Sequence, residues 1–444
     1  MKHKITRLLL SLVFLAGLAA NAQEKKVLSL NEAIELSIKN SHQLKNNQAK
    51  VEEATAALKE ATQKRLPNAT VSGSYLRLNT ANLDLKTKNN SGSGSTSESP
   101  SVSQAMYGLL NISLPIYSGG RIKYGIESSR YLEQASRLDA ENDRDEVIQN
   151  TIEAFANLFK AKTAVRLVKE NLLQSQQRTK DFSNLEKNGL LARNDLLKAE
   201  LQSSNVELSL LDAENNWQLA NVNMDLMLGL PDGTEIVVDT AGIEKRDDNR
   251  TLEDFEQSAI TNRKDLAALT LRKKAAESDV KVSRSELYPS FQLTGGYIAA
   301  DIPHVLTVTN AVNAGVGISY NIASLWKTRA KVQQADARVK QMVQTQALLD
   351  DNIRLQVKKS YLTLLSNRKK IDVYAKAVTQ AEENYRILKN KFDNNLATTT
   401  DLLEADVAQL QARLSYTLSR ADAFVSYNKL LQTAGISITD FKNK

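Results

Sequence analysis

Two long stretches of the chain carry apolar residues at intervals of three and four, the spacing that places side chains on one face of an α-helix. The clearer stretch comprises Ile371, Tyr374, Val378, Ala381, Tyr385, Leu388 and Phe392. The other includes Ile148, Ile152, Phe155 and Phe159. We expect long helices over about 120–187 and 327–393, followed by partner helices over 193–228 and 401–433. Helices of this length are typical of a coiled coil, a bundle or a tube, because no compact core needs them.

Four shorter stretches alternate between apolar and polar residues, which is the pattern of β-strands. We expect strands over about 68–78, 105–117, 290–300 and 311–323. In the last of them, Val316 and Ile318 alternate with Gly317 and Ser319. Four two-faced strands of about ten residues fit the wall of a transmembrane β-barrel. A soluble hairpin beside a helical bundle is the alternative, because it shows the same alternation.

The order of elements occurs twice along the chain. Leu30 to Tyr75 aligns with Leu252 to Tyr297 at a constant offset, and Asp195 to Leu197 aligns with Asp401 to Leu403 at a smaller one. The difference falls on a polar, flexible loop in the first copy, around residues 89–95. Each copy therefore reads helix, strand, loop, strand, long helix, turn and helix, and the chain is one unit used twice.

The repeat is preceded by a segment with the features of a secretory signal peptide. A basic head is followed by an apolar run from Leu8 to Ala20 and by the small-residue cleavage site Ala20-Asn21-Ala22. The apolar run is too short to span a bilayer as a helix, although a retained anchor is the alternative. We divide the chain into a signal peptide (1–22), a first repeat (23–228), a connector (229–250), a second repeat (251–435) and a tail (436–444).

Two further local predictions follow from the sequence. A helix beginning near Leu30 should end at Leu66, because Pro67 disfavours helical geometry in the residue before it. Within the connector, the apolar run at 235–238 predicts a short strand.

Four strands are too few to close a barrel around a lumen. An open sheet in lipid would leave unpaired backbone groups at its edges, which the hydrocarbon core does not permit. Closure therefore requires several copies of the chain, and three copies would supply twelve strands.

Composition narrows the class of protein. Only 6 of its 444 residues are Pro, and 5% are aromatic. This scarcity of helix-breaking and strand-favouring residues is typical of a mainly helical protein. The chain has 0 Cys, which excludes a lipid-anchored N-terminal cysteine and disulfides. No other apolar run approaches the length of a membrane-spanning helix. Without the three cations of the signal peptide the formal net charge falls from +7 to +4, which gives no support to nucleic-acid binding.

No catalytic or cofactor-binding constellation is visible. His42 and His304 stand apart, without a Cys or a paired His, so we expect no metal site. The glycines at 92 and 94 lack the Lys and helix start of a phosphate-binding loop. The pair Gly119-Gly120 more simply lets a strand bend into a helix. An enzyme on a helical scaffold is the least favoured class.

Short segments mark the junctions between the expected elements: Leu66-Pro67, Tyr288-Pro289, Leu114 to Arg121 (LPIYSGGR) and Asn188 to Leu191. In this order, and within a duplicated chain, they resemble the TolC family of outer-membrane efflux proteins over nearly the whole mature sequence. The resemblance implies a mainly α-helical fold with a transmembrane β-barrel of four strands per protomer. It also implies a homotrimer whose coiled-coil tunnel extends from the outer membrane of a Gram-negative bacterium into the periplasm.

The same resemblance implies a function. The chain would be the outer-membrane channel of a tripartite efflux or type I secretion system, exporting small molecules or proteins with a periplasmic adaptor and an inner-membrane transporter. The alternative is a periplasmic coiled-coil adaptor or tether, which needs the long helices but not the four strands. Dependence on detergent for extraction separates the two.

The turns between the paired helices are the candidate docking tip. They comprise Gly189, Leu190 and Leu191 in the first copy and Asn395, Leu396 and Ala397 in the second. Gly suits a turn that needs positive φ, and Asn tolerates the same conformation. The resemblance implies that these turns meet the tip of the adaptor. The alternative for both Leu190 and Leu396 is that they cap the hydrophobic seam.

Asp401 and Glu404 are the candidate pore gate. They lie three apart near the start of the last helix, so both carboxylates share one helical face. The resemblance implies that they match the acidic ring that closes the family's tunnel, although Ala397 stands where studied members carry an arginine. The alternative is a capping box with Asp401 as N-cap and Glu404 as its third residue.

Overall fold

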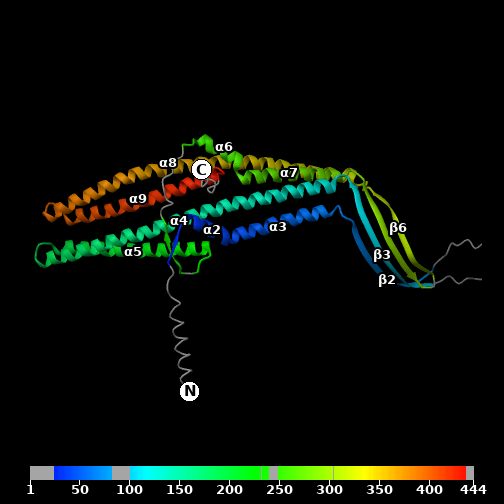
Figure 1. The fold of residues 1–444 in the computed structure, drawn as a ribbon, viewed down its shortest axis with the longest axis horizontal. Helices are drawn as coiled ribbons and strands as arrows, with labels where there is room; N and C mark the ends of the chain where they lie inside the picture. Colours follow the sequence, from blue (N-terminus) through cyan, green and yellow to red (C-terminus); the bar gives the residue numbers. More distant parts are fainter. Residues whose placement is uncertain (1–24, 83–100, 232, 240–248, 304, 437–444) are drawn as a thin grey trace, which may run out of the picture. The chain divides into compact units, whose positions relative to one another are not determined.

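The computed structural model describes residues 25–82, 101–231, 233–239, 249–303 and 305–436. The predicted signal peptide, the polar loop at 89–95, His304 and the tail from residue 437 onward lie outside this part of the chain. Most described residues are helical, and strands form two sheets (Figure 1). The chain divides into two compact units, and the long helices contribute residues to both.

The elements of the first half are β1 (Lys25–Leu28), α2 (Leu30–Asn40), α3 (His42–Gln63), β2 (Asn68–Asn82), β3 (Ser101–Ser118), α4 (Arg121–Lys187) and α5 (Arg193–Leu228). Those of the second half are β4 (Glu235–Val238), α6 (Leu252–Asn262), α7 (Lys264–Ser285), β5 (Ser290–Ile302), β6 (Leu306–Ser319), α8 (Ser324–Asp393) and α9 (Thr399–Thr433). Corresponding helices have similar lengths: α4 has 67 residues and α8 has 70, whereas α2 and α6 have 11 each.

The single helix expected from Leu30 to Leu66 is wrong, because the chain forms two helices there. Ser41 leaves helical geometry with φ −56° and ψ 118°, and its hydroxyl accepts a hydrogen bond from the backbone N–H of Leu44 at 3.3 Å. A Ser side chain that caps the following turn competes with a continuous helix, so α2 ends and α3 begins at this residue.

The first unit to be described contains residues 49–137 and 268–347, and its centre is an antiparallel sheet in the order β2-β3-β5-β6. Its register places one apolar residue of each strand side by side: Val71 opposes Leu110, Leu110 opposes Tyr297, and Tyr297 opposes Val312. The apolar faces read from the sequence are therefore one face of the sheet. β2 and β6 are its edges, each paired on one side only within the described chain.

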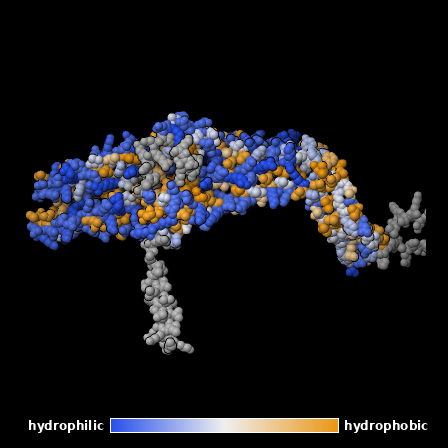
Figure 2. Space-filling model, viewed as in Figure 1, coloured by the Kyte–Doolittle hydropathy of each residue, from blue (hydrophilic) through white to orange (hydrophobic). Residues whose placement is uncertain are grey.

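The described part of the chain leaves much of the apolar face of this sheet exposed. Val71 is 83% exposed, Val312 79%, Val316 69% and Ile318 68%. Figure 2 shows hydrophobic residues gathered over the strands, whereas the helices are mostly hydrophilic. No described helix is both long enough and apolar enough to cross a membrane.

The last strand ends earlier than its alternating sequence predicts, at Ser319 rather than residue 323. Asn321 makes a turn there, because its side-chain oxygen accepts from the N–H of Ala323 at 3.1 Å and its carbonyl accepts from Ser324 at 2.9 Å. At the equivalent junction of β3 and α4, Gly119 and Gly120 have φ of 63° and 91°, a conformation that favours glycine.

The second unit contains residues 25–48, 138–267 and 348–436 among those described. Strands β1 and β4 pair in parallel, and β4 is the strand expected at 235–238. This small sheet contributes Ile236 to a hydrophobic core in which Phe155 and Met224 are fully buried. A second core joins α6 to α8 and α9 around Phe255 and Leu430. The seven apolar seam residues of α8 are all partly buried.

Candidate functional site

The two helical turns at residues 188–192 and 394–398 have the same backbone geometry. Gly189 has φ 72° and Asn395 has φ 57°. In each turn the next residue donates to a carbonyl five residues back, Leu190 to Leu185 at 2.9 Å and Leu396 to Lys391 at 2.7 Å. A left-handed residue followed by this hydrogen bond is the Schellman motif, which ends a helix abruptly. Positive φ at both positions agrees with the expectation from Gly and Asn.

The leucines of the two turns differ in what they contact. Leu190 is 71% exposed and Leu396 is 76% exposed, so neither caps the hydrophobic seam within the chain. Leu191 is partly buried and packs against a cluster formed by Phe182, Leu196, Ala199 and Leu402. Of the three residues proposed for the tip in this turn, Leu191 therefore faces back toward the helices rather than outward.

The hydrophobic cluster beneath the turns joins two helical hairpins. The first hairpin is formed by α4 and α5, and the second by α8 and α9. It draws Phe182 from α4, Leu196 from α5, Phe392 from α8 and Leu402 from α9. The rings of Phe182 and Phe392 stack with centroids 5.2 Å apart. The turns of both repeats are thus supported by one shared core.

Asp401 and Glu404 are both exposed in the first turns of α9. The capping box expected from Asp401 and Glu404 is wrong: Thr398 is the N-cap, and Asp401 is its third residue. The Asp401 N–H donates to the Thr398 hydroxyl at 3.2 Å, and the Asp401 carboxylate accepts from the Thr398 N–H at 2.9 Å. The helix therefore begins at Thr399, two residues before Asp401.

This arrangement separates the two candidate gate residues. Hydrogen bonds from the Thr398 side chain and backbone lower the pKa of Asp401. Glu404 takes no part in the box. Ala397 is partly buried in the turn that precedes α9. In α5, the residues equivalent to the acidic pair are Asp195 and Lys198, which approach each other at 3.5 Å.

A buried ion pair that the sequence reading missed lies close to the gate residues. Arg178 on α4 contacts both carboxylate oxygens of Asp406 on α9, at 3.0 and 3.1 Å. Their side chains are 9% and 1% exposed. Asn171 donates to the same carboxylate at 3.3 Å, and Arg178 donates to the Tyr385 hydroxyl on α8 at 3.3 Å. Three of the four helices of the two hairpins meet at this network.

The electrostatics of the pair follow from its position. Burial alone would lower the pKa of Arg178 by disfavouring its charged form. The hydrogen bond and charge of Asp406, together with Tyr385, outweigh this effect and raise the pKa. The signal available in the sequence was weak: Asp406 is a charged residue between the buried positions of α9, but its partners lie on two other helices.

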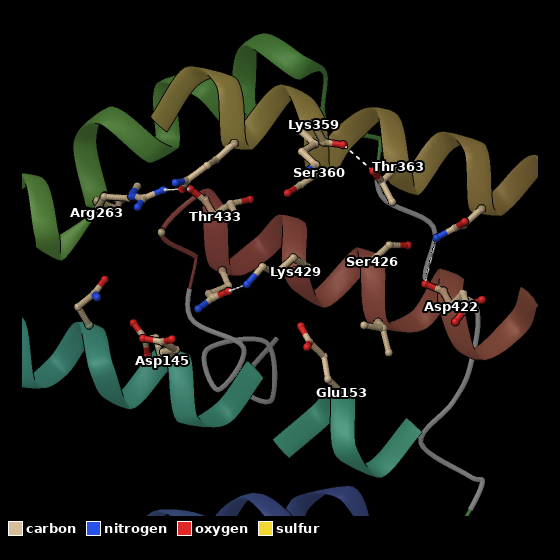
Figure 3. Close-up of a pocket in the computed structure, with 18 of the residues that line it drawn as sticks. Asp145, Glu153, Arg263, Lys359, Ser360, Thr363, Asp422, Ser426, Lys429 and Thr433 are labelled. Carbon is tan, nitrogen blue, oxygen red and sulfur yellow. Dashed lines mark hydrogen bonds between the residues drawn. The ribbon is translucent and has the colours of Figure 1, made fainter. Parts of the chain in front are cut away.

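The same unit contains a polar cavity of about 770 Å³, drawn in Figure 3, between α4, α8, α9 and the start of α7. Its charges are largely paired. Lys264 binds Asp145 at 3.0 Å, Lys160 binds Asp422 at 2.9 Å, and Arg263 is directed at the Thr433 carbonyl at 3.4 Å. None of the candidate gate or tip residues lines it. Its ion pairs connect α4 to α7 and α9, which is a structural role.

Among the described residues, no group of three or more His, Asp or Glu side chains is arranged to hold a metal ion. His42 lies at the start of α3, away from the tip and the gate.

The family model described as outer membrane efflux protein matches residues 33–230 and 256–435. A comparison with curated proteins gave no match.

Three of the solved structures that the fold resembles are the outer membrane protein VceC of Vibrio cholerae, the CmeC outer membrane channel of Campylobacter jejuni and a membrane protein from Pseudomonas aeruginosa. VceC is 18% identical with a TM-score of 0.75, covering 92% of this chain and 96% of VceC. CmeC is 19% identical with a TM-score of 0.76, covering 91% and 85%. The Pseudomonas protein is 15% identical with a TM-score of 0.80, covering 94% and 93%. At these identities the likeness establishes the fold.

Proposed function

The chain belongs to the outer membrane efflux protein family, and from this premise we propose that it is the outer-membrane channel of a tripartite efflux or type I secretion system. Three copies would form a twelve-stranded barrel in the outer membrane and a helical tunnel in the periplasm. A periplasmic adaptor and an inner-membrane transporter would deliver small molecules or proteins to it. The observation that carries this proposal is the four-stranded sheet.

Among the described residues, the sheet combines an exposed apolar face with two edge strands, β2 and β6, that each pair on one side only. Val71 and Val316 are 83% and 69% exposed, which is unfavourable in water and suits contact with lipid. The edges β2 and β6 would leave their backbone groups unsatisfied in the hydrocarbon core. Pairing of β6 in one copy with β2 in the next resolves both edges at once, and a closed ring of copies leaves none.

Two helices of the second unit, α5 and α8, also carry exposed apolar side chains, which support assembly of several copies. One face of α5 carries apolar side chains that are 47–69% exposed along its whole length, namely Leu197, Leu201, Leu208, Leu211, Leu219, Val222 and Leu226. On α8, Leu348, Leu355 and Leu362 recur every seven residues and are 55–65% exposed. Heptad spacing is the pattern of helices that pack against a partner. We assign these α5 and α8 stripes to contacts between neighbouring copies.

The candidate residues have roles within this assembly. The exposed Leu190 and Leu396 would meet the tip of the adaptor. Asp401 and Glu404 of three copies would place six carboxylates around one axis, where mutual repulsion opposes ionisation and attracts cations to a narrow mouth. Arg178 and Asp406 would hold the two hairpins of each copy together beside that mouth.

The absence of native cysteine allows a direct test of the assembly. Single cysteines placed along the α5 stripe, paired with single cysteines along the α8 stripe, should form disulfides between copies and give a ladder that ends at trimer. Leu173→Cys is the matched control, because Leu173 is 61% exposed on α4 and belongs to neither stripe. The protein should fractionate with the outer membrane and require detergent. A monomer released without detergent would instead support the periplasmic tether.

A further inference from the structure

We propose that the strand–helix junctions of the sheet unit form a cationic collar that binds the phosphate groups of anionic phospholipids in the inner leaflet of the outer membrane. The cationic collar comprises Arg121 and Lys123 on α4 and Lys327 and Arg329 on α8. This inference rests on the proposed membrane barrel, and it adds a lipid-binding site and its ligand class.

At the junction of β6 and α8, exposed apolar residues lead directly to two cations. Ile318 is 68% exposed and Ile322 is 63% exposed, in line with the apolar face of the strand. Trp326 follows in the first turn of α8 and is 65% exposed. Lys327 and Arg329 come next, and both are exposed. Arg329 lies three residues after Trp326, so the two side chains share one side of the helix.

The junction of β3 and α4 has the same order. Ile116 is 61% exposed and Tyr117 is 46% exposed at the end of the strand. The exposed Arg121 and Lys123 follow at the beginning of α4. Tyr117 lies on the apolar face of the sheet, where its ring is 6.1 Å from that of Phe291. Two separate junctions therefore show aliphatic, then aromatic, then cationic side chains.

Both junctions lack acidic residues. Residues 116–126 and 320–335 contain no Asp or Glu. Within the described part of the chain, Arg121, Lys327 and Arg329 have no carboxylate at ion-pair distance, whereas Lys331, slightly further along α8, binds Glu286 at 2.8 Å. Lys123, the fourth cation of the collar, lies over the ring of Tyr124 at 5.6 Å from its centroid, a contact that leaves its charge without a counter-ion among the described residues.

This order of side chains matches the layers of a bilayer leaflet. Aliphatic side chains suit the hydrocarbon, Trp and Tyr suit the interface, and Lys and Arg extend to the phosphates. Arg can bind a phosphate with two parallel hydrogen bonds. Anionic headgroups favour each nearby cation by about fivefold in affinity.

Depth-dependent fluorescence quenching tests where the junction lies. The chain has 2 Trp, so Trp217→Phe leaves Trp326 as the only indole. The full-length variant is placed in vesicles that contain phosphatidylcholine brominated at different depths of the acyl chain. We expect the shallowest label to quench Trp326 most strongly. A lack of quenching by any label in vesicles with inserted trimers would mean that a neighbouring copy or water covers Trp326, and would overturn the collar while leaving the channel intact.

Binding of phosphatidylglycerol to the detergent-solubilised trimer, counted by native mass spectrometry against phosphatidylcholine, tests the ligand class. Lys327→Gln with Arg329→Gln should weaken phosphatidylglycerol binding by roughly an order of magnitude. Arg338→Gln with Lys340→Gln is the matched control, because it removes the same charge from exposed positions further along α8. Equal losses in both variants, or no preference for phosphatidylglycerol in the parent, would overturn the proposal. Failure of the parent to form inserted trimers would instead contradict the channel itself, and the collar with it.

Discussion

Arg178 on α4 and Asp406 on α9 form a two-pronged ion pair inside the helical unit, with contacts of 3.0 and 3.1 Å and side chains that are 9% and 1% exposed. The pair connects the first helical hairpin to the second. Tyr385 extends the connection to α8 through its hydroxyl. Because both charges are withdrawn from water, each depends on the other, and loss of one leaves an uncompensated charge.

Removing one partner of this pair should therefore be costly. Arg178→Met or Asp406→Leu alone should lower the free energy of unfolding by about 3–5 kcal/mol, whereas the double change should recover much of that loss. Tyr385→Phe should cost only about 1 kcal/mol. Urea unfolding in detergent, followed by circular dichroism, measures each value.

The control for the pair is Arg166→Met. Arg166 contacts Glu170 at 3.1 Å one turn away on α4, with side chains 62% and 51% exposed. Such a surface pair contributes less than about 1 kcal/mol. Equal effects of Arg166→Met and Arg178→Met would contradict a special role for the buried pair.

The features of the fold that the sequence predicted are those that repeat along the chain. The seam of α8 and the alternation of β6 each rest on several residues in regular spacing, so one exception does not hide the pattern. The break at Ser41 rests on a single side chain that accepts one hydrogen bond, and the periodic pattern on both sides concealed it.

The candidate site was predictable where local backbone chemistry decides it. Gly189 and Asn395 were expected at positive φ, because few other residues adopt that conformation, and both do. The capping box was assigned to the wrong residues, because Thr398 and Asp401 both fit an N-cap and the sequence does not show which of them precedes the helix. The pair of Arg178 and Asp406 could not be found, since its members meet only after the hairpins pack.

The tip prediction concerns Leu190 and Leu396, which are the exposed leucines of the two turns. Changing both to Asp should abolish adaptor binding, because charged side chains oppose burial of an apolar contact, while trimers still form. Cross-linking of the adaptor in intact cells and efflux of a fluorescent dye report the loss. Leu173→Asp, at a 61% exposed position of α4 outside the turns, should leave both unchanged. Normal efflux in the double variant would remove the docking role.

The wall prediction concerns Val316, which lies opposite Leu293 on the apolar face of the sheet and is 69% exposed. Val316→Arg should destabilise the inserted barrel by about 2–4 kcal/mol if the site is near the midplane of the bilayer. Ser319→Arg, on the other face, should have a milder effect. The yield of heat-resistant trimers in outer-membrane fractions measures both. Small and equal effects at the two positions would contradict the assignment of faces.

At the start of α9, Glu404 carries a charge but does not cap the helix, whereas Thr398 caps the helix but carries no charge. The gate prediction removes these two contributions one at a time. Glu404→Gln removes a carboxylate that takes no part in the capping box, so it should weaken cation selectivity without loosening the helix. Thr398→Ala does the reverse, because it removes the N-cap hydroxyl and leaves both carboxylates in place. Reversal potentials in planar bilayers under a salt gradient, beside thermal unfolding of the same variants, distinguish the two effects.

The pH dependence of selectivity gives the gate a second, independent test. Hydrogen bonds from Thr398 lower the pKa of Asp401, and so they work against the repulsion between the carboxylates of three copies, which opposes ionisation. The contribution of Asp401 to stability is complete above the unfolded-state pKa and is lost as the pH falls through the lowered folded-state value. Thr398→Ala should therefore move the midpoint of selectivity loss to higher pH, because the carboxylate loses the hydroxyl donor and keeps only the backbone N–H at that position. If Asp401→Asn combined with Glu404→Gln leaves both selectivity and block by multivalent cations unchanged, these residues serve the helix alone, and the constriction is formed by other side chains.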